Sequence, residues 1–207
     1  MLPAQRPVVT EDQYLAAERQ SPTKHELVNG VVVAMAGASP RHNAIAVNVT
    51  VALAGRLRGR CHVLNSDQRV HVEATGLYAY PDVVVVCGAP RFHPRDEDTL
   101  TNPTLLVEVL SPLTEAYDRG AKFAHYRSIP SLMEYVLVSQ DEPRVEHYRR
   151  LDTGQWLLTE YHGEGALLSV HTPGIEVPLA EIFGGLEAFP PAVPQESQRR
   201  GDHAIGS

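Results

Sequence analysis

The sequence predicts a mixed α/β fold in which helices cover both faces of a central mixed sheet. Between residues 40 and 139 the predicted elements follow the order helix, strand, strand, strand, helix, strand. Two of these strands, residues 82–87 and 105–110, are long apolar runs, which are typical of strands buried on both faces. Residues 40–57 carry apolar side chains at three- and four-residue spacings, the period of a helix. These patterns together favour helices packed on both sides of one sheet.

The N-terminal part is predicted to hold a short helix and a hairpin. Thr10 is followed three residues later by Gln13, the spacing of a capping box that begins a helix. Further along, residues 25–35 form two apolar segments on either side of Asn29-Gly30. This dipeptide readily adopts the two positive φ values of a type I′ turn, so we expect a tight antiparallel hairpin.

The other elements are predicted from the hydrophobic periods of helices and strands and from the positions of turn residues. They are a helix at 40–57, strands at 62–72, 82–87 and 105–110, a polar loop at 88–102, a helix at 114–127, a strand at 132–139, and an antiparallel meander at 144–150, 155–162 and 167–170. Residues 187–207 are rich in proline and polar side chains and are expected to form a disordered tail. The rest, 1–186, is expected to be a single domain.

Composition excludes some classes of protein and leaves the partner open. With 18 basic against 25 acidic residues, the net charge is −7, which argues against a protein that coats polyanions by bulk attraction. A bound cation can still supply local positive charge, so nucleic acid remains a possible partner. No apolar stretch approaches the roughly 18 residues of a membrane span, and we expect a cytoplasmic protein. The two cysteines, Cys61 and Cys87, are expected to be reduced and buried.

One acidic residue lies in the middle of an apolar strand. An isolated buried carboxylate is costly, so Glu108 must be neutralised, paired or bound to a cation. Asp82 begins the preceding apolar strand, and neighbouring strands would place the two carboxylates about 5 Å apart. Mg²⁺ or Mn²⁺ would satisfy such a pair. Lys122, on the following helix, could hold a nucleophilic water or a phosphate oxygen.

Five segments of the chain together resemble a known family. They are His25-Glu26-Leu27-Val28-Asn29-Gly30, Pro81-Asp82-Val83, PTLLVEVLS at 103–111, Lys122-Phe123-Ala124-His125-Tyr126 and Glu134-Tyr135. In order and spacing they resemble the Uma-type family of restriction-endonuclease-like proteins, within the PD-(D/E)xK nuclease superfamily, over about residues 10 to 185. The resemblance implies a restriction-endonuclease-like core and a metal-dependent phosphodiesterase site. It implies that Asp82 and Glu108 are metal ligands and that Glu26 is an additional acidic member.

The sequence departs from the usual superfamily pattern at two places. The usual lysine follows the acidic residue of the third strand by two positions, where this chain has Leu110, so Lys122 would be a migrated lysine. The helix at 40–57 contains neither Asp nor Glu, although many members carry an acidic residue there. Glu26 or His42 could take that place.

Each acidic or basic candidate also has a purely structural interpretation. Asp82 could make a local turn contact at the start of its strand, and Glu108 could form a buried salt bridge with Lys122. Glu26 could be an exposed strand carboxylate. Asp118 precedes Lys122 by four residues, the spacing of an ordinary helical ion pair, although a role in the site is also open to it.

Two further candidates could contact substrate. His42 lies at a helix start, where it could cap the helix or bind substrate. Arg56, with Arg58 and Arg60, could bind a phosphate backbone, although an exposed helix end explains the same residues. The other histidines lack HxxxH or HExxH spacing, so we expect no zinc site. Ser111 lacks a GxSxG elbow, which argues against a serine hydrolase.

The function expected from these observations is hydrolysis of nucleic acid, with DNA as the expected substrate and Mg²⁺ or Mn²⁺ as the cofactor. Two alternatives stay open. The protein could be an inactive nuclease fold that binds or assembles, or a small-molecule phosphodiesterase with the loop at 88–102 as a lid. A homodimer is expected for an enzyme that cuts two strands.

Overall fold

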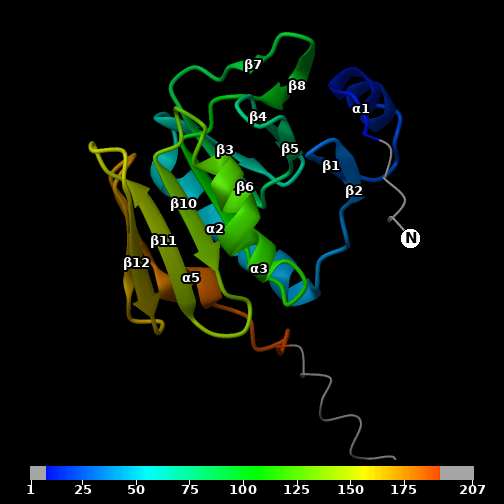
Figure 1. The fold of residues 1–207 in the computed structure, drawn as a ribbon. Coiled ribbons are helices and arrows are strands. Elements are labelled where there is room, and N and C mark those ends of the chain that lie inside the picture. Colours follow the sequence, from blue (N-terminus) through cyan, green and yellow to red (C-terminus); the bar gives the residue numbers. More distant parts are fainter. Residues whose placement is uncertain (1–7, 192–207) are drawn as a thin grey trace, which may run out of the picture.

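The computed structural model describes residues 8–191, whose strands form two six-stranded sheets and a separate two-stranded hairpin (Figure 1). Sheet A has the order β2 (Val31–Ala34), β1 (His25–Val28), β5 (Leu77–Ala79), β4 (Arg69–Val72), β8 (Asp96–Leu100) and β7 (Phe92–His93). Sheet B has the order β12 (Trp156–His162), β11 (Arg144–Arg150), β10 (Glu134–Val138), β9 (Leu105–Val109), β6 (Val83–Cys87) and β3 (Cys61–Asn65). A separate hairpin pairs β13 (Leu167–Val170) with β14 (Ile175–Pro178).

Sheet B is mixed and is covered on both faces, as the sequence predicts, but on one face the cover comes from a second sheet as well as from helical residues. Strands β9 and β10 are parallel, and the other neighbours in the sheet are antiparallel. One face packs against α2 (Pro40–Leu57), α5 (Leu179–Phe183) and the β13–β14 hairpin. The other face packs against sheet A and against the helical segment that follows β9 (Figure 1). The central strands are therefore buried on both sides, which explains their apolar runs.

The predicted N-terminal helix and hairpin are confirmed. Helix α1 (Glu11–Glu18) begins at a capping box in which Thr10 and Gln13 exchange hydrogen bonds of 3.0 and 3.3 Å. Strands β1 and β2 meet at Asn29 and Gly30, whose φ angles are 51° and 75°. The turn thus has the two positive φ values that the dipeptide favours.

The long helix α2 has the predicted bounds. Ser39 accepts a hydrogen bond from the backbone of His42, and Pro40 occupies the first turn, where a missing N–H costs nothing. The apolar stripe that ends at Leu57 faces sheet B.

The prediction of one strand over 62–72 is wrong. The chain turns after Asn65, whose side chain accepts a hydrogen bond of 3.1 Å from the backbone of Asp67. As a result β3 joins sheet B beside β6, whereas β4 joins sheet A between β5 and β8. The Asx turn interrupts an otherwise continuous strand pattern.

The prediction of a loop over 88–102 is also wrong, because this segment contains β7 and β8. Asp96 is one of the charged residues that led to the prediction of a polar loop. It is only 2% exposed, however, and it pairs with Arg69, which is itself buried. Arg69 also donates a hydrogen bond of 2.7 Å to Thr99. A carboxylate neutralised in this way is compatible with a buried strand, and the segment is part of sheet A rather than a free lid.

Three other expectations need correction or lie outside the described residues. The third strand of the predicted meander does not join β12, because β13 pairs with β14. The cysteines are not reduced: Cys61 lies opposite Cys87 in the β3–β6 pairing, their Cα atoms are 4.2 Å apart, and they form a disulfide. Most of the predicted tail, residues 192–207, lies outside the described residues.

Within residues 8–191, the structure has no helix that is long and apolar enough to span a bilayer.

The buried pair in sheet A gives a test of the fold. Replacing Asp96 with Ala leaves the Arg69 guanidinium buried without its partner, so we expect the free energy of unfolding to fall by about 3 to 5 kcal/mol. Asp98→Ala, at an exposed position of the same strand, is the matched control. Urea denaturation measures the free energy of unfolding of both variants. A small loss of stability that is equal in Asp96→Ala and Asp98→Ala would contradict a stabilising role of the buried Asp96–Arg69 pair.

The disulfide gives a second test. Without reductant, the denatured protein should expose no reactive thiol, and after reduction it should expose two. Because the bond closes a loop of 26 residues, Cys87→Ser should lower the free energy of unfolding by about 3 kcal/mol in non-reducing buffer. The difference from the wild type should vanish once the wild type is reduced. Free thiols in unreduced protein would refute the bond.

Candidate active site

The site is built first on the antiparallel pair β6 and β9. Their register places Val83 opposite Val107, so Asp82 and Glu108 face each other at the next position. The Asp82 backbone N–H donates to Oε2 of Glu108 at 3.3 Å, and the Val109 N–H donates to Oδ2 of Asp82 at 2.7 Å. Each carboxylate is therefore held by the backbone of the other strand, and the two lie side by side as the sequence predicts.

The segment after β9 differs from the predicted continuous helix. It comprises α3 (Glu115–Tyr117), a π-helical turn η1 (Asp118–Lys122) and α4 (Phe123–Tyr126). Two apolar residues of this segment, Ala121 and Ala124, are exposed. A π turn takes more residues per turn than an α turn, and such turns are frequent at functional sites. Here it directs polar side chains, rather than alanines, toward sheet B.

The buried face of this segment consists of Asp118, Lys122 and Tyr126. The ammonium of Lys122 lies 3.0 Å from Oε1 of Glu108, 3.2 Å from Oε1 of Glu26 and 3.4 Å from Oδ1 of Asp118. The Tyr126 hydroxyl donates to Oε1 of Glu108 at 3.0 Å. Because Glu26 comes from β1, the ammonium connects the N-terminal hairpin, the central strand and the helical segment.

His42 reaches the site from α2, the helix that covers the opposite face of sheet B. Its Nε2 lies 3.2 Å from Oδ2 of Asp82. Burial by itself lowers the pKa of His42, but the hydrogen bond and the charge of Asp82 outweigh it and raise the pKa above the ordinary value. His42 reaches Asp82 because the Ser39 cap begins α2 beside the start of β6.

Negative charge exceeds positive charge at this site. Burial, together with the nearby carboxylates, raises the pKa of Glu108 to about 8, although Lys122 opposes the shift. Burial alone would lower the pKa of Lys122, yet Glu108, Glu26 and Asp118 raise it well above the ordinary value. Four carboxyl groups thus surround one ammonium: those of Glu26, Asp82, Glu108 and Asp118. Their mutual repulsion and their burial favour the protonated form of Glu108.

This donor set fits a hard divalent cation. All four acidic residues offer oxygen, the ligand atom that Mg²⁺ and Mn²⁺ prefer. Oε1 of Glu26 and Oδ1 of Asp118 are buried, and within the described residues each has the Lys122 ammonium as an ion-pair partner but accepts no hydrogen bond. Asp82 and Glu108 lie side by side on neighbouring strands, and a cation between them would offset the excess negative charge.

The site opens to solvent on one side. The side chains of Asp82 and His42 are 17% and 12% exposed, whereas those of Glu108 and Lys122 are 6% and 8% exposed. A substrate would therefore approach past Asp82 and His42.

Five of the six candidates from the sequence meet here: Glu26, His42, Asp82, Glu108 and Lys122. Arg56 does not. It forms a bidentate pair with Glu181 at 2.7 and 2.8 Å, and it lies 14 residues after His42, about 21 Å along the helix axis. Asp118 also belongs to the site, where it contacts Lys122. Tyr126, which donates to Glu108, is a site residue that was not predicted from the sequence. The repeat of Asp118, Lys122 and Tyr126 at four-residue intervals was the signal that could have identified Tyr126.

Comparisons with known proteins show which family the chain is similar to. A family model described as "Putative restriction endonuclease", Uma2, matches residues 11–180. Two uncharacterized proteins of Synechocystis sp. are similar: one is 38% identical over 167 residues (80% of this chain and 94% of the relative), and the other is 36% identical over 184 residues (87% and 94%).

A solved structure shares the fold. It is described as a "putative nuclease belonging to DUF820" from Anabaena variabilis, and it superposes with a TM-score of 0.70 over 84% of this chain and 97% of that chain. At 17% identity, this likeness concerns the fold.

The raised pKa of Glu108 predicts a pH dependence of stability. Because the folded state holds this proton more tightly, the stabilisation is complete below the ordinary pKa of 4.5 and is lost as the pH rises through about 8. In metal-free buffer, the stability of the wild type relative to Glu108→Gln should therefore fall between pH 5 and 8, by at most about 1.4 kcal/mol per pH unit. Urea denaturation across this range measures the difference. Glu73→Gln, at an exposed position, is the control, and a flat difference for Glu108→Gln would contradict the shift.

Proposed function

The chain belongs to the Uma2 family of restriction-endonuclease-like proteins, and from this membership we propose that it is a metal-dependent nuclease that hydrolyses phosphodiester bonds of DNA. The observation that carries the proposal is the Asp82–Glu108 pair with the ammonium of Lys122 at 3.0 Å from Glu108. DNA is proposed as the substrate because the family description names a restriction endonuclease.

Asp82 and Glu108 are proposed to hold Mg²⁺ or Mn²⁺, with Glu26 beside them. The excess of carboxylates and the raised pKa of Glu108 support this role, since a divalent cation stabilises ionised carboxylates. When bound, such an ion lowers the pKa of a water molecule and offsets charge on the phosphate.

Lys122 is proposed to take the role of the lysine that Leu110 replaces in the usual pattern. Leu110 is 4% exposed and is part of the apolar core, so it offers no charge. The Lys122 ammonium instead approaches the carboxylate of Glu108 from the helical segment that follows β9. It stays protonated because the surrounding carboxylates raise its pKa. A fixed positive charge at that point can orient the attacking water or stabilise the negative charge that develops on the phosphate.

The remaining residues are proposed to position this machinery. Tyr126 donates to Oε1 of Glu108, which restricts the rotation of that carboxylate. His42 contacts Asp82 at the solvent side, where a phosphate would arrive. Arg56 is left out of the proposed site, since Glu181 occupies its guanidinium.

The test is cleavage of supercoiled plasmid and of labelled single-stranded DNA and RNA with Mg²⁺ or Mn²⁺. Asp82→Asn and Glu108→Gln change the charge but hardly the volume, so each should lower the cleavage rate by at least about 100-fold without unfolding the protein. Lys122→Met should cause a similar loss. Glu73→Gln, at an exposed surface position, should cleave like the wild type.

Three outcomes would count against the proposal. Undiminished cleavage by Asp82→Asn or Glu108→Gln would reject the site. No cleavage of any nucleic acid by the wild type would favour an inactive binding module, and turnover of only a small phosphodiester would favour the small-molecule enzyme. Preference for RNA would reject DNA as the substrate but would leave the proposed phosphodiester hydrolysis in place.

A further inference from the structure

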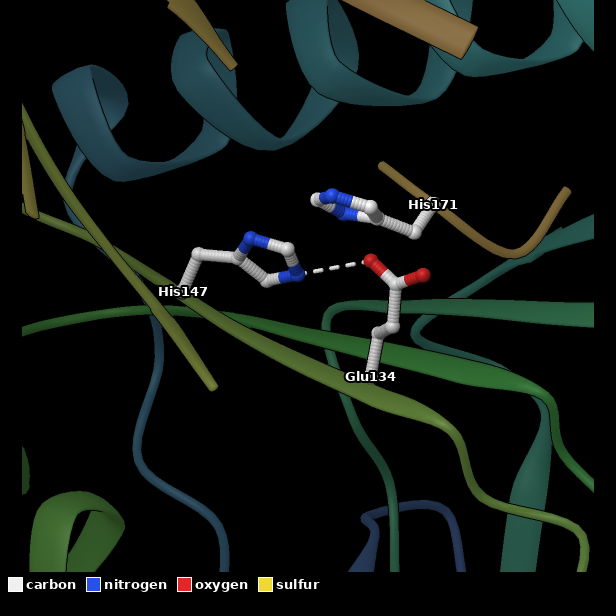
Figure 2. Close-up of side chains that lie close together, drawn as sticks. All are labelled: Glu134, His147 and His171. Atoms are coloured by element: carbon white, nitrogen blue, oxygen red, sulfur yellow. Dashed lines mark hydrogen bonds and ion pairs between the residues drawn. The ribbon is translucent and has the colours of Figure 1, made fainter. Parts of the chain in front are cut away.

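A second group of ionisable side chains lies on sheet B, away from the candidate active site. Glu134 on β10, His147 on β11 and His171 in the turn between β13 and β14 point toward one another (Figure 2). One ligand atom from each lies within 4.8 Å of the other two. Glu134 and His147 are 0% and 1% exposed, whereas His171 is exposed.

This group lies on the opposite face of sheet B from Glu108. Along β10, Glu134 alternates with core residues so that it shares a face with Val136, which packs against α2. Glu108 lies between Val107 and Val109, which also face α2, and so it points to the other side. The two groups are therefore separated by the sheet itself.

Two imidazoles and one carboxylate form a characteristic donor set. Zn²⁺ and similar first-row divalent ions bind imidazole nitrogen well, whereas Mg²⁺ prefers oxygen ligands only. We propose that Glu134, His147 and His171 form a zinc-type metal site distinct from the nuclease site.

The local contacts fit this assignment. Glu134 is fully buried, and its only ion-pair partner within residues 8–191 is His147, with Oε2 of Glu134 and Nε2 of His147 at 2.6 Å. A metal ion would take the place of this hydrogen bond, and two ligands of a tetrahedral ion lie about 3.3 Å apart, so a modest opening suffices. The other carboxylate oxygen, Oε1, accepts a hydrogen bond from the Thr172 backbone N–H. Such an outer contact orients a ligating carboxylate.

The position of His171 indicates what the ion does. His171 and Thr172 belong to the β13–β14 turn, whereas Glu134 and His147 belong to sheet B. An ion held by all three residues ties the separate hairpin to the sheet over the core that α2 and α5 also cover. Its role is structural, and exposed His171 provides the entry for the ion.

The test uses the full chain after removal of metal with a chelator. Zn²⁺ is titrated by calorimetry with Mg²⁺ in excess, which occupies oxygen-only sites, and Co²⁺ is used as a visible-absorption probe of nitrogen coordination. The wild type should bind one equivalent of Zn²⁺ that raises its melting temperature. His171→Ala changes an exposed turn residue, so it should still fold, and its Zn²⁺ affinity should be at least about 100-fold lower, with loss of the Co²⁺ band.

Matched controls separate this site from others. His62→Ala removes an exposed histidine from β3, three strands away from β10, and should retain the zinc equivalent. Glu108→Gln should retain it as well, so that failure of the proposed nuclease site leaves this result unchanged. Equal Zn²⁺ affinity and equal Co²⁺ spectra in wild type and His171→Ala would overturn the proposal and leave Glu134 and His147 as a simple buried pair.

Discussion

The buried ammonium of Lys122 is the interaction on which the candidate site depends. It lies within 3.4 Å of carboxylate oxygens from three separate parts of the chain: β1, β9 and the π-helical turn. Burying these carboxylates in ionised form is costly without a cation, and burying the charged lysine is costly without them. The ammonium therefore fixes the N-terminal hairpin and the helical segment against the same strand of sheet B.

The charge at this point is not balanced by the lysine alone. Burial, together with the surplus of carboxyl groups, raises the pKa of Glu108 to about 8, so the arrangement favours a further cation. The excess negative charge therefore supports the proposed metal-dependent reaction. On the other face of sheet B, Glu134 is buried with histidine partners instead of a lysine, and a different class of ion suits that donor set.

Much of the fold could be predicted because its signals are local. The Thr10–Gln13 capping box, the Asn29-Gly30 turn and the periodicity of 40–57 each depend on residues close in sequence, and all three predictions are confirmed. The predictions failed where a distant partner decided the outcome. Asp96 is in a buried strand because Arg69 neutralises it, and Cys61 is bonded because β3 lies beside β6.

By itself the sequence determined the N-terminal capping box and hairpin, the helix α2 and the central apolar strands β6 and β9, and that Asp82 and Glu108 would meet on neighbouring strands. Backbone propensity and the cost of burying a charge act within a few residues, so they can be read from the sequence. The tertiary structure alone decided that Glu26 and Lys122 reach Glu108, that Arg56 does not, and that Glu134, His147 and His171 converge. These contacts depend on strand order, register and one π turn, which follow from pairing between segments far apart in the chain.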